Sequence, residues 1–434
     1  MKRREFLKSA IYSGVGLACA PWLVNAQTNT YAGPILITIE AAGGWDTTLH
    51  FDPKVNQPNE LEITHWSNEA TIQSVGNINY APVFNNEQFL QKFGDRLLVI
   101  NGVDTQTNSH LTGITHSFSG RNSEGYPSLP ALFSSVHAPD IPFSYLSLGG
   151  YANTSGLIMS TNVSGGHSLQ NVLLRDRWQA DNPYRTHKET ELINQALAKD
   201  YDIYSNTDVL PRYQKAMENY RNAAKLSPSL EPFLDILPTD NDYQPEVGLG
   251  PQGSSQALSQ AQLLLLACKA GVCSSGSFRA GGGYDTHQNN DELQYLLLGH
   301  LNDTIEFIWD YAEELNIADR LTLVVTSDFS RTNHYNSANG KDHWPTNSYL
   351  VMQKNATWAN RTVGATDEFQ NPMTINPDTL AIDNSSSGLI LNPAHVHNEL
   401  RKTLGLSGHI NEAKFPYLLT PDVALFSSPN NTVT

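Results

Sequence analysis

Acidic and histidine side chains gather at the ends of apolar runs in this sequence. Asp285 and His287 are two positions apart, so both side chains lie on one side of the chain if the segment is extended. With a second imidazole from His343, they would form a three-ligand set for a divalent metal with an open position. Asp46 and Asp328 follow other apolar runs and are predicted to hold a second ion or to bias the first.

This set of residues suits phosphoryl or sulfuryl transfer, because two nearby divalent ions stabilise both the attacking and the leaving oxygen. Arg331 is the candidate clamp for an anionic oxygen. Residues 110–121 (HLTGITHSFSGR) could open a helix, and a hydroxyl at a helix N-terminus facing a metal is suited to be a nucleophile. The candidate catalytic residues in this segment are Thr115, His116 and Ser117.

Each candidate also has a structural alternative. Asp46 follows two glycines and suits a turn or a helix cap, and Asp285 suits a cap for the helix after it. His343 could pack within a loop, Arg331 could form a surface ion pair, and the hydroxyls of the Ser/Thr-rich segment could be plain helix caps. The chemical interpretation rests on the recurrence of such residues at the ends of four apolar runs.

Short candidate strands would position these side chains. They are residues 34–39, an apolar and β-branched run, residues 96–101 and 144–148, residues 278–283, which run into glycines, and residues 321–326. Between the last two, apolar residues recur at helical spacing from position 293 to position 308. A strand, a long helix and a strand form a βαβ unit, so we expect a parallel sheet with the ligand site beyond the carboxyl ends of its strands.

The expected fold class is therefore α/β, with a three-layer, mostly parallel, doubly wound sheet in one domain over residues 27–434. Polar, helix-prone sequence at 175–255 interrupts the alternation of strands and helices and predicts a helical insertion. Residues 395–406 predict a short amphipathic helix. Cys268 and Cys273 lie near a helix end, where a disulfide and two buried thiols are both compatible with the spacing.

Residues 1–26 have the features of a twin-arginine signal peptide. Arg3 and Arg4 precede Phe-Leu-Lys, a weakly apolar stretch runs from position 10 to position 24, and small residues precede Gln27. The apolar stretch is too short and too interrupted to span a membrane stably. We expect export by the twin-arginine translocase, a periplasmic or secreted location, and no stable membrane insertion.

The charge of the chain narrows the choice of partners. It has 27 basic and 43 acidic residues, and removal of residues 1–26 leaves 23 basic and 42 acidic residues, a net charge of -19 with neutral histidines. This charge disfavours non-specific binding to nucleic acid or anionic lipid. It also repels a phosphate or sulfate ester, unless cations or arginines are concentrated at one site.

Five stretches resemble the domain of unknown function 1501 family, a group of twin-arginine-exported proteins in the alkaline phosphatase/sulfatase-like superfamily. In family order they are 42–46 (AGGWD), 115–118 (THSF), 282–287 (GGYDTH), 326–331 (TSDFSR) and 340–345 (GKDHWP). The resemblance implies an alkaline phosphatase-like α/β fold and a metal-dependent ester hydrolase. It also implies one metal site at Asp285, His287 and His343, and part of another at Asp46 and Asp328.

The chain departs from the superfamily at three points. Phe329 stands where a histidine usually follows the aspartate that matches Asp328, the spacing of Asp285 and His287 is shorter than usual, and no Cys/Ser-x-Pro-x-Arg motif supplies a formylglycine. We predict an exported hydrolase of a small anionic phosphate or sulfate ester that uses one or two divalent ions, zinc, calcium or manganese. The alternative is a catalytically inactive binding or assembly protein on the same scaffold.

Overall fold

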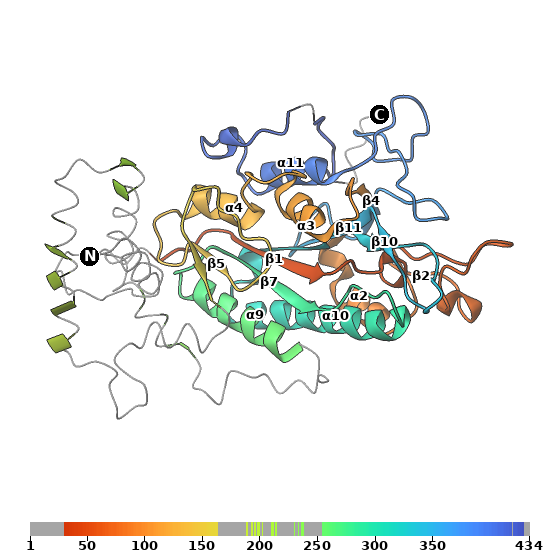
Figure 1. The fold of residues 1–434 in the computed structure, drawn as a ribbon, viewed down its shortest axis with the longest axis horizontal. Coiled ribbons are helices and arrows are strands. Elements are labelled where there is room, and N and C mark those ends of the chain that lie inside the picture. Colours follow the sequence, from red (N-terminus) through yellow and green to blue (C-terminus); the bar gives the residue numbers. More distant parts are fainter. Residues whose placement is uncertain are drawn as a thin grey trace.

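The strand β1 (Ile35–Ala42) lies inside an eight-stranded sheet, where it pairs with a strand on each side. The computed structural model describes residues 30–163, 254–418 and 420–428, together with isolated positions between 188 and 237. In spatial order the strands are β12 (Arg361–Val363), β4 (Leu97–Asp104), β11 (Thr346–Gln353), β8 (Leu321–Ser327), β1, β7 (Ser275–Gly282), β5 (Tyr145–Ser147) and β6 (Ser160–Asn162) (Figure 1).

Most neighbouring strands in this sheet are parallel. β1 pairs in parallel with β7 and β8, β5 pairs in parallel with β6 and β7, and β12 pairs in parallel with β4. Only β11 is reversed within the described sheet, and it is antiparallel to both β4 and β8. The mostly parallel sheet is confirmed, whereas the sequence analysis did not predict β11.

The side chains of β1 point alternately to the two faces of the sheet, and this alternation explains why helices cover both faces. Ile35, Ile37 and Ile39 point into one apolar cluster, and Leu36 points into another on the opposite face of the sheet. The helices on the first face are α2 (Asn86–Phe93), α9 (Ser254–Lys269) and α10 (Asn290–Glu314). Those on the second face are α3 (His110–Ser119), α4 (Leu129–His137) and α11 (Pro393–Thr403). The predicted three-layer α/β architecture is confirmed (Figure 1).

The remaining sequence predictions have different outcomes. The predicted long helix is α10 and the predicted terminal helix is α11. The predicted signal peptide (1–26) lies outside the described residues, and so does most of the predicted insertion (175–255). Within the described part of the chain, no helix has the length and apolar character needed to cross a bilayer. Cys268 and Cys273 are buried free thiols.

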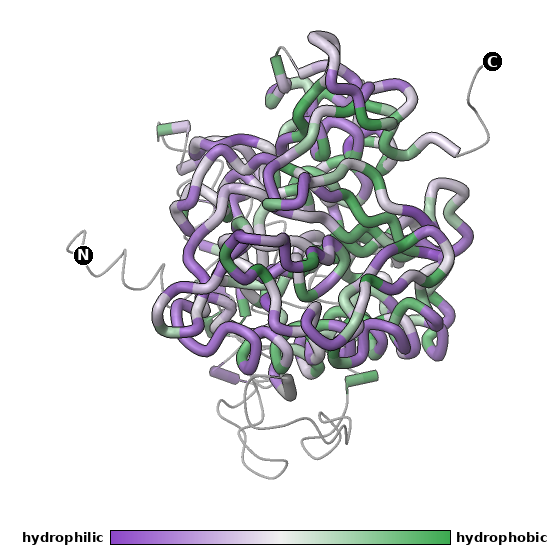
Figure 2. Tube along the Cα trace, turned by 90° about the vertical axis from the view of Figure 1, so that its right-hand side faces the viewer, coloured by the Kyte–Doolittle hydropathy of each residue, from purple (hydrophilic) through white to green (hydrophobic). Residues whose placement is uncertain are grey.

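Hydrophobic stretches run through the interior, and hydrophilic stretches dominate the outer loops (Figure 2). Five histidines are nevertheless buried in this framework: His50, His116, His300, His395 and His397. The His50 ring stacks on Phe51 at 3.7 Å between ring centroids, and His397 donates from Nε2 to the Ser117 carbonyl at 2.9 Å. Burial lowers the pKa of His50 and of His397 to about 3, and that of His395 to about 4. The fold therefore holds these three rings uncharged.

We expect the protein to lose stability as the pH falls below 6.5, the ordinary pKa of histidine. The unfolded chain takes up protons near that pH, whereas the folded chain resists protonation until the pH approaches 3 to 4. The stabilisation is therefore fully present above pH 6.5 and declines below it, by about 1.4 kcal/mol per pH unit for each histidine. Urea unfolding at a series of pH values measures this slope. His50→Gln should reduce it, and an unchanged slope would contradict the assignment.

Candidate metal centre

The carboxyl ends of three neighbouring parallel strands form the floor of the site. Ala42 of β1 lies beside Gly282 of β7, and Ala41 lies beside Ser327 of β8. The chain segments that follow these strands carry the residues selected from the sequence, so the parallel register brings distant motifs together. This is the arrangement that the strand pattern predicted.

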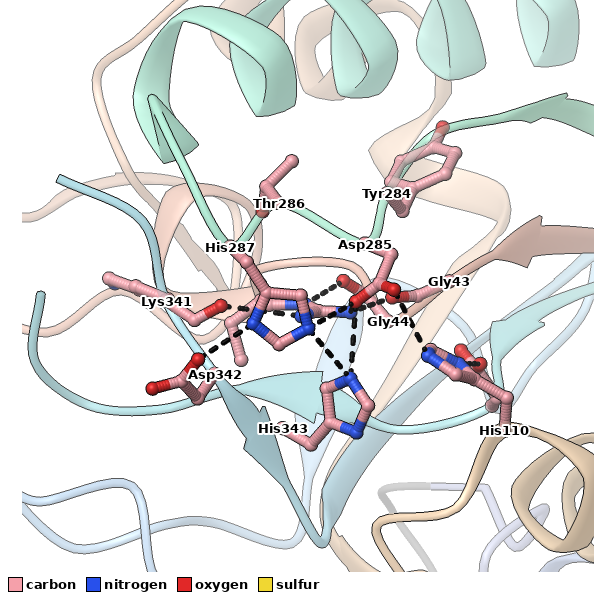
Figure 3. Close-up of polar contacts among 12 residues, drawn as sticks. Gly43, Gly44, His110, Tyr284, Asp285, Thr286, His287, Lys341, Asp342 and His343 are labelled. Atoms are coloured by element: carbon pink, nitrogen blue, oxygen red, sulfur yellow. Dashed lines mark hydrogen bonds and ion pairs between the residues drawn. The ribbon is translucent and has the colours of Figure 1, made fainter. Parts of the chain in front are cut away.

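The Asp285 carboxylate lies at the centre of a histidine cluster (Figure 3). Its Oδ1 atom is 3.0 Å from Nε2 of His287 and 3.1 Å from Nε2 of His343. Its Oδ2 atom is 3.3 Å from Nε2 of His110. The Nε2 atoms of His287 and His343 are themselves 3.1 Å apart. One carboxylate and three imidazoles, drawn from three segments of the chain, therefore converge.

The three imidazoles are oriented in the same way, because an outer acceptor holds each Nδ1 atom. His287 donates to Asp342 at 2.7 Å, and His343 donates to the Asn108 carbonyl at 2.7 Å. His110 donates from Nδ1 to Oδ2 of Asp328.

Carbonyl and carboxylate oxygens only accept, so each Nδ1 carries a hydrogen and Nε2 of each neutral ring carries a lone pair. Metal-ligating histidines in proteins are held in this way.

These distances fit a bound cation. Ligand atoms of a tetrahedral zinc site lie about 2.0–2.1 Å from the ion, and therefore about 3.3 Å from one another. One ligand atom each of His110, Asp285 and His343 lie within 4.8 Å of one another. The Nε2 atom of His110 is buried and makes no hydrogen bond within the described part of the chain. A cation among these three residues would give the Nε2 lone pairs of His110 and His343 a partner.

The surrounding charges favour an ionised Asp285. Burial alone would raise the pKa of its carboxyl, but the positive charge of Arg331 helps to lower it below its usual value. The hydrogen bond from His287 likewise lowers the pKa of Asp342, which keeps this acceptor in its carboxylate form. The hydrogen bond to Asp328 raises the pKa of His110.

Sequence reasoning missed His110. It begins α3, directly after the loop that follows β4, so its position at the end of a strand was the signal that could have identified it. Its ring lies 4.8 Å from that of Phe329 between centroids. A histidine therefore contacts Asp328 from a different segment, although the residue after Asp328 is phenylalanine.

Two predicted metal ligands have other partners. Asp46 is fully buried, and its Oδ2 atom is 2.7 Å from Nζ of Lys341. It also caps the 3-10 helix Thr47–Leu49, which is the structural alternative that the sequence left open. Asp328 holds His110 through Oδ2 and accepts from Ser327 through Oδ1 at 2.8 Å. Neither carboxylate belongs to the cluster around Asp285.

Arg331 is not placed as an anion clamp. Its guanidinium is fully buried, lies 2.9 Å from Oδ1 of Asp285, and donates to the carbonyls of Gly43, Gly44 and Lys341. Burial lowers the pKa of this guanidinium. Since each of its nitrogens already has a protein acceptor, its role is to fasten the glycine loop after β1 to Asp285.

The predicted catalytic residues of α3 are turned to the protein interior. The hydroxyl of Thr115 donates to the Leu111 carbonyl at 2.8 Å, and that of Ser117 donates to the Asp328 carbonyl at 3.3 Å. His116 donates to the Thr105 carbonyl at 2.9 Å.

The physical reason is that α3 begins at His110, so residues 115–117 lie beyond its first turn. The residue at its N-terminus is Ser109, which is exposed and makes no capping hydrogen bond through its side chain.

The amino-acid sequence matches one known protein family. The model of a family described as protein of unknown function (DUF1501) matches residues 35–381. No curated protein matches the sequence.

Similar solved structures include the alkaline phosphatase from the Antarctic bacterium TAB5, with 9% identity and a TM-score of 0.37 over 86% of this chain and 99% of that one. A 2-O GAG sulfatase has 7% identity and a TM-score of 0.33 over 88% and 72%. A protein from a study of glycosaminoglycan metabolism by Bacteroides thetaiotaomicron has 9% identity and a TM-score of 0.41 over 93% and 78%. These TM-scores are below 0.5, so the fold assignment rests on the sheet topology.

We expect Gly340→Ala to disrupt the contact between the two loops of the cluster. A Cβ atom at Gly340 would overlap the backbone carbonyl of His287, so the 340–343 segment would have to move away. The expected loss of stability exceeds about 1 kcal/mol, because the native backbone cannot accept the side chain. Urea unfolding measures it. Gly282→Ala is the matched control, since no described atom lies within 4 Å of its Cβ position, and equal losses in both variants would refute this account.

Proposed function

Since this chain belongs to the family described as protein of unknown function (DUF1501), we propose its function from the site itself: a metal-dependent hydrolase of phosphate or sulfate esters. The observation that carries the proposal is the convergence of three Nε2 atoms on the Asp285 carboxylate, each ring being held by an outer acceptor at Nδ1. This donor set favours a divalent transition metal such as zinc.

In this proposal Asp285, His287 and His343 hold the ion, and His110 adds a further nitrogen. A bound divalent ion supplies positive charge that offsets the charge of the ester and polarises its oxygen. The side chains of Asp285 and His287 are 43% and 44% exposed, so a substrate can reach the cluster from solvent. The cation would also offset the repulsion between an anionic ester and this chain, which has a net charge of -16. The guanidinium of Arg331 is not available for that purpose, because it is paired with Asp285.

Ser109 is the proposed attacking residue, in place of Thr115 and Ser117. The residues on either side of Ser109 in the chain both contact the cluster. The Asn108 carbonyl accepts a hydrogen bond from His343, and the His110 ring lies against Asp285. Ser109 is the N-cap of α3, whose first-turn N–H groups and positive dipole end favour an anion. Its hydroxyl would lose its proton to water, attack phosphorus or sulfur and displace the alcohol of the ester, while the first-turn N–H groups of α3 steady the remaining oxygens. Water would then cleave the seryl ester, releasing phosphate or sulfate and restoring the Ser109 hydroxyl.

A second candidate function is a binding or assembly protein that has kept the metal centre and lost turnover. The full engagement of Arg331 favours it, because no arginine clamp remains at the cluster. The two candidates differ in turnover and not in metal content. Export through the twin-arginine translocase and a periplasmic or secreted location stay part of the proposal in either case.

We expect the purified protein to bind a divalent metal and Asp285→Ala to abolish that binding. Asp342→Asn should weaken the affinity by about 10–100-fold, because it removes the negative charge of the acceptor that orients His287. Isothermal titration with zinc, manganese and calcium measures both effects. Asp422→Asn, an exposed carboxylate that pairs with Lys402, is the control and should bind as the wild type does. A wild-type protein without metal affinity would refute the proposal.

Turnover is tested on a panel of aryl phosphates and aryl sulfates with metal restored. Ser109→Ala should lower kcat by about 100-fold or more while metal affinity is kept, since removal of a nucleophile costs orders of magnitude in rate. Thr115→Ala, within the same helix, should retain activity. Metal binding without turnover on any substrate of the panel would favour the binding or assembly protein.

A further inference from the structure

Asp46 lies in a fully occupied polar environment. Its Oδ1 atom accepts from the backbone N–H of Thr48 at 3.1 Å and from the Thr48 hydroxyl at 2.6 Å. Its Oδ2 atom accepts from the amide of Asn290 at 2.9 Å and lies 2.7 Å from Nζ of Lys341. Both carboxylate oxygens therefore have two partners, and one of the four is a cation.

Lys341 is held at this position from all sides. It is fully buried, its Nζ atom also donates to the Thr48 hydroxyl at 3.1 Å, and that atom lies 4.9 Å from the centroid of the Tyr335 ring. Its backbone N–H donates to the Thr286 carbonyl at 2.9 Å, and its own carbonyl accepts from Arg331 at 3.3 Å. The ammonium cannot withdraw to solvent without breaking these contacts.

The Lys341–Asp46 pair is joined to the histidine cluster through Arg331. This guanidinium bonds to the Lys341 carbonyl on one side and to Asp285 on the other. Thr286, which accepts from the Lys341 backbone, lies between Asp285 and His287 in the chain. The pair is therefore part of the same construction, at the place where the sequence predicted a second metal ion.

We propose that the ammonium of Lys341 takes the place of a second metal ion at Asp46, so that the centre holds one ion. A divalent cation at Oδ2 would compete with an ammonium 2.7 Å away, and like charges at that separation in a buried site repel strongly. The ammonium of Lys341 supplies a single positive charge, which neutralises the Asp46 carboxylate without metal. The inference rests on the proposed metal-dependent function and specifies the number of its ions.

The first test is the metal content of the wild-type protein, measured by elemental analysis after equilibration with zinc, manganese or calcium. One equivalent per chain is expected. Two equivalents would overturn this inference and leave the proposed function intact, whereas none would overturn both. Asp46→Asn should still bind one equivalent, and a folded variant that binds none would overturn the inference by identifying Asp46 as a ligand.

The second test removes the ammonium. Lys341→Gln leaves the Asp46 carboxylate without its cation, and we expect the variant to take up a second equivalent that raises Tm. Asp46→Asn in the Lys341→Gln background should return the content to one. Lys54→Gln, which breaks a pair with Asp52 of similar length at 2.8 Å, is the matched control and should stay at one.

A folded Lys341→Gln protein that binds one equivalent would overturn the inference. If that variant does not fold, the metal content of the wild-type protein and of Asp46→Asn decides whether the centre holds one ion.

Discussion

The Asp285 carboxylate is the interaction on which the rest of the site depends. The imidazole of His287, two residues away in the chain, contacts it. The imidazoles of His110 and His343 and the guanidinium of Arg331 contact it as well, from other segments. These groups come from α3, from the segment before β11, and from the turn after β8. A single charged group therefore sets how closely four loops approach one another, and a cation among the imidazoles would strengthen the same arrangement.

Two buried basic side chains complete this construction. Arg331 fastens the glycine loop after β1 to Asp285, and Lys341 neutralises Asp46 beneath it. Breaking a buried ion pair leaves an uncompensated charge, which is strongly destabilising, so such pairs tie these loops to one arrangement. From the sequence, Arg331 was a candidate anion clamp or a surface ion pair. Its burial, like that of Lys341, makes it a support of the centre.

Much of the fold could be predicted because apolar periodicity reports directly on burial. The runs that became β1, β4 and β8 are apolar and contain β-branched residues, as expected for strands covered on both faces. β11 was missed because its first residues, Thr346, Asn347 and Ser348, are polar. Those residues are buried and hydrogen-bonded to the neighbouring strands and to Trp45, so their polarity is satisfied within the protein.

The sequence by itself determined the α/β class and the grouping of Asp285, His287 and His343, because strand ends in a parallel sheet share one edge and the motifs are short and ordered. Only the tertiary structure decided the partners of each group. His110 joined the cluster and Thr115 left it because α3 begins five residues earlier than the hydroxyl motif. Asp46 faces Lys341, 295 positions away, because the register of β1 and β8 and the path of the loop after β8 place them together, and no local pattern records that proximity.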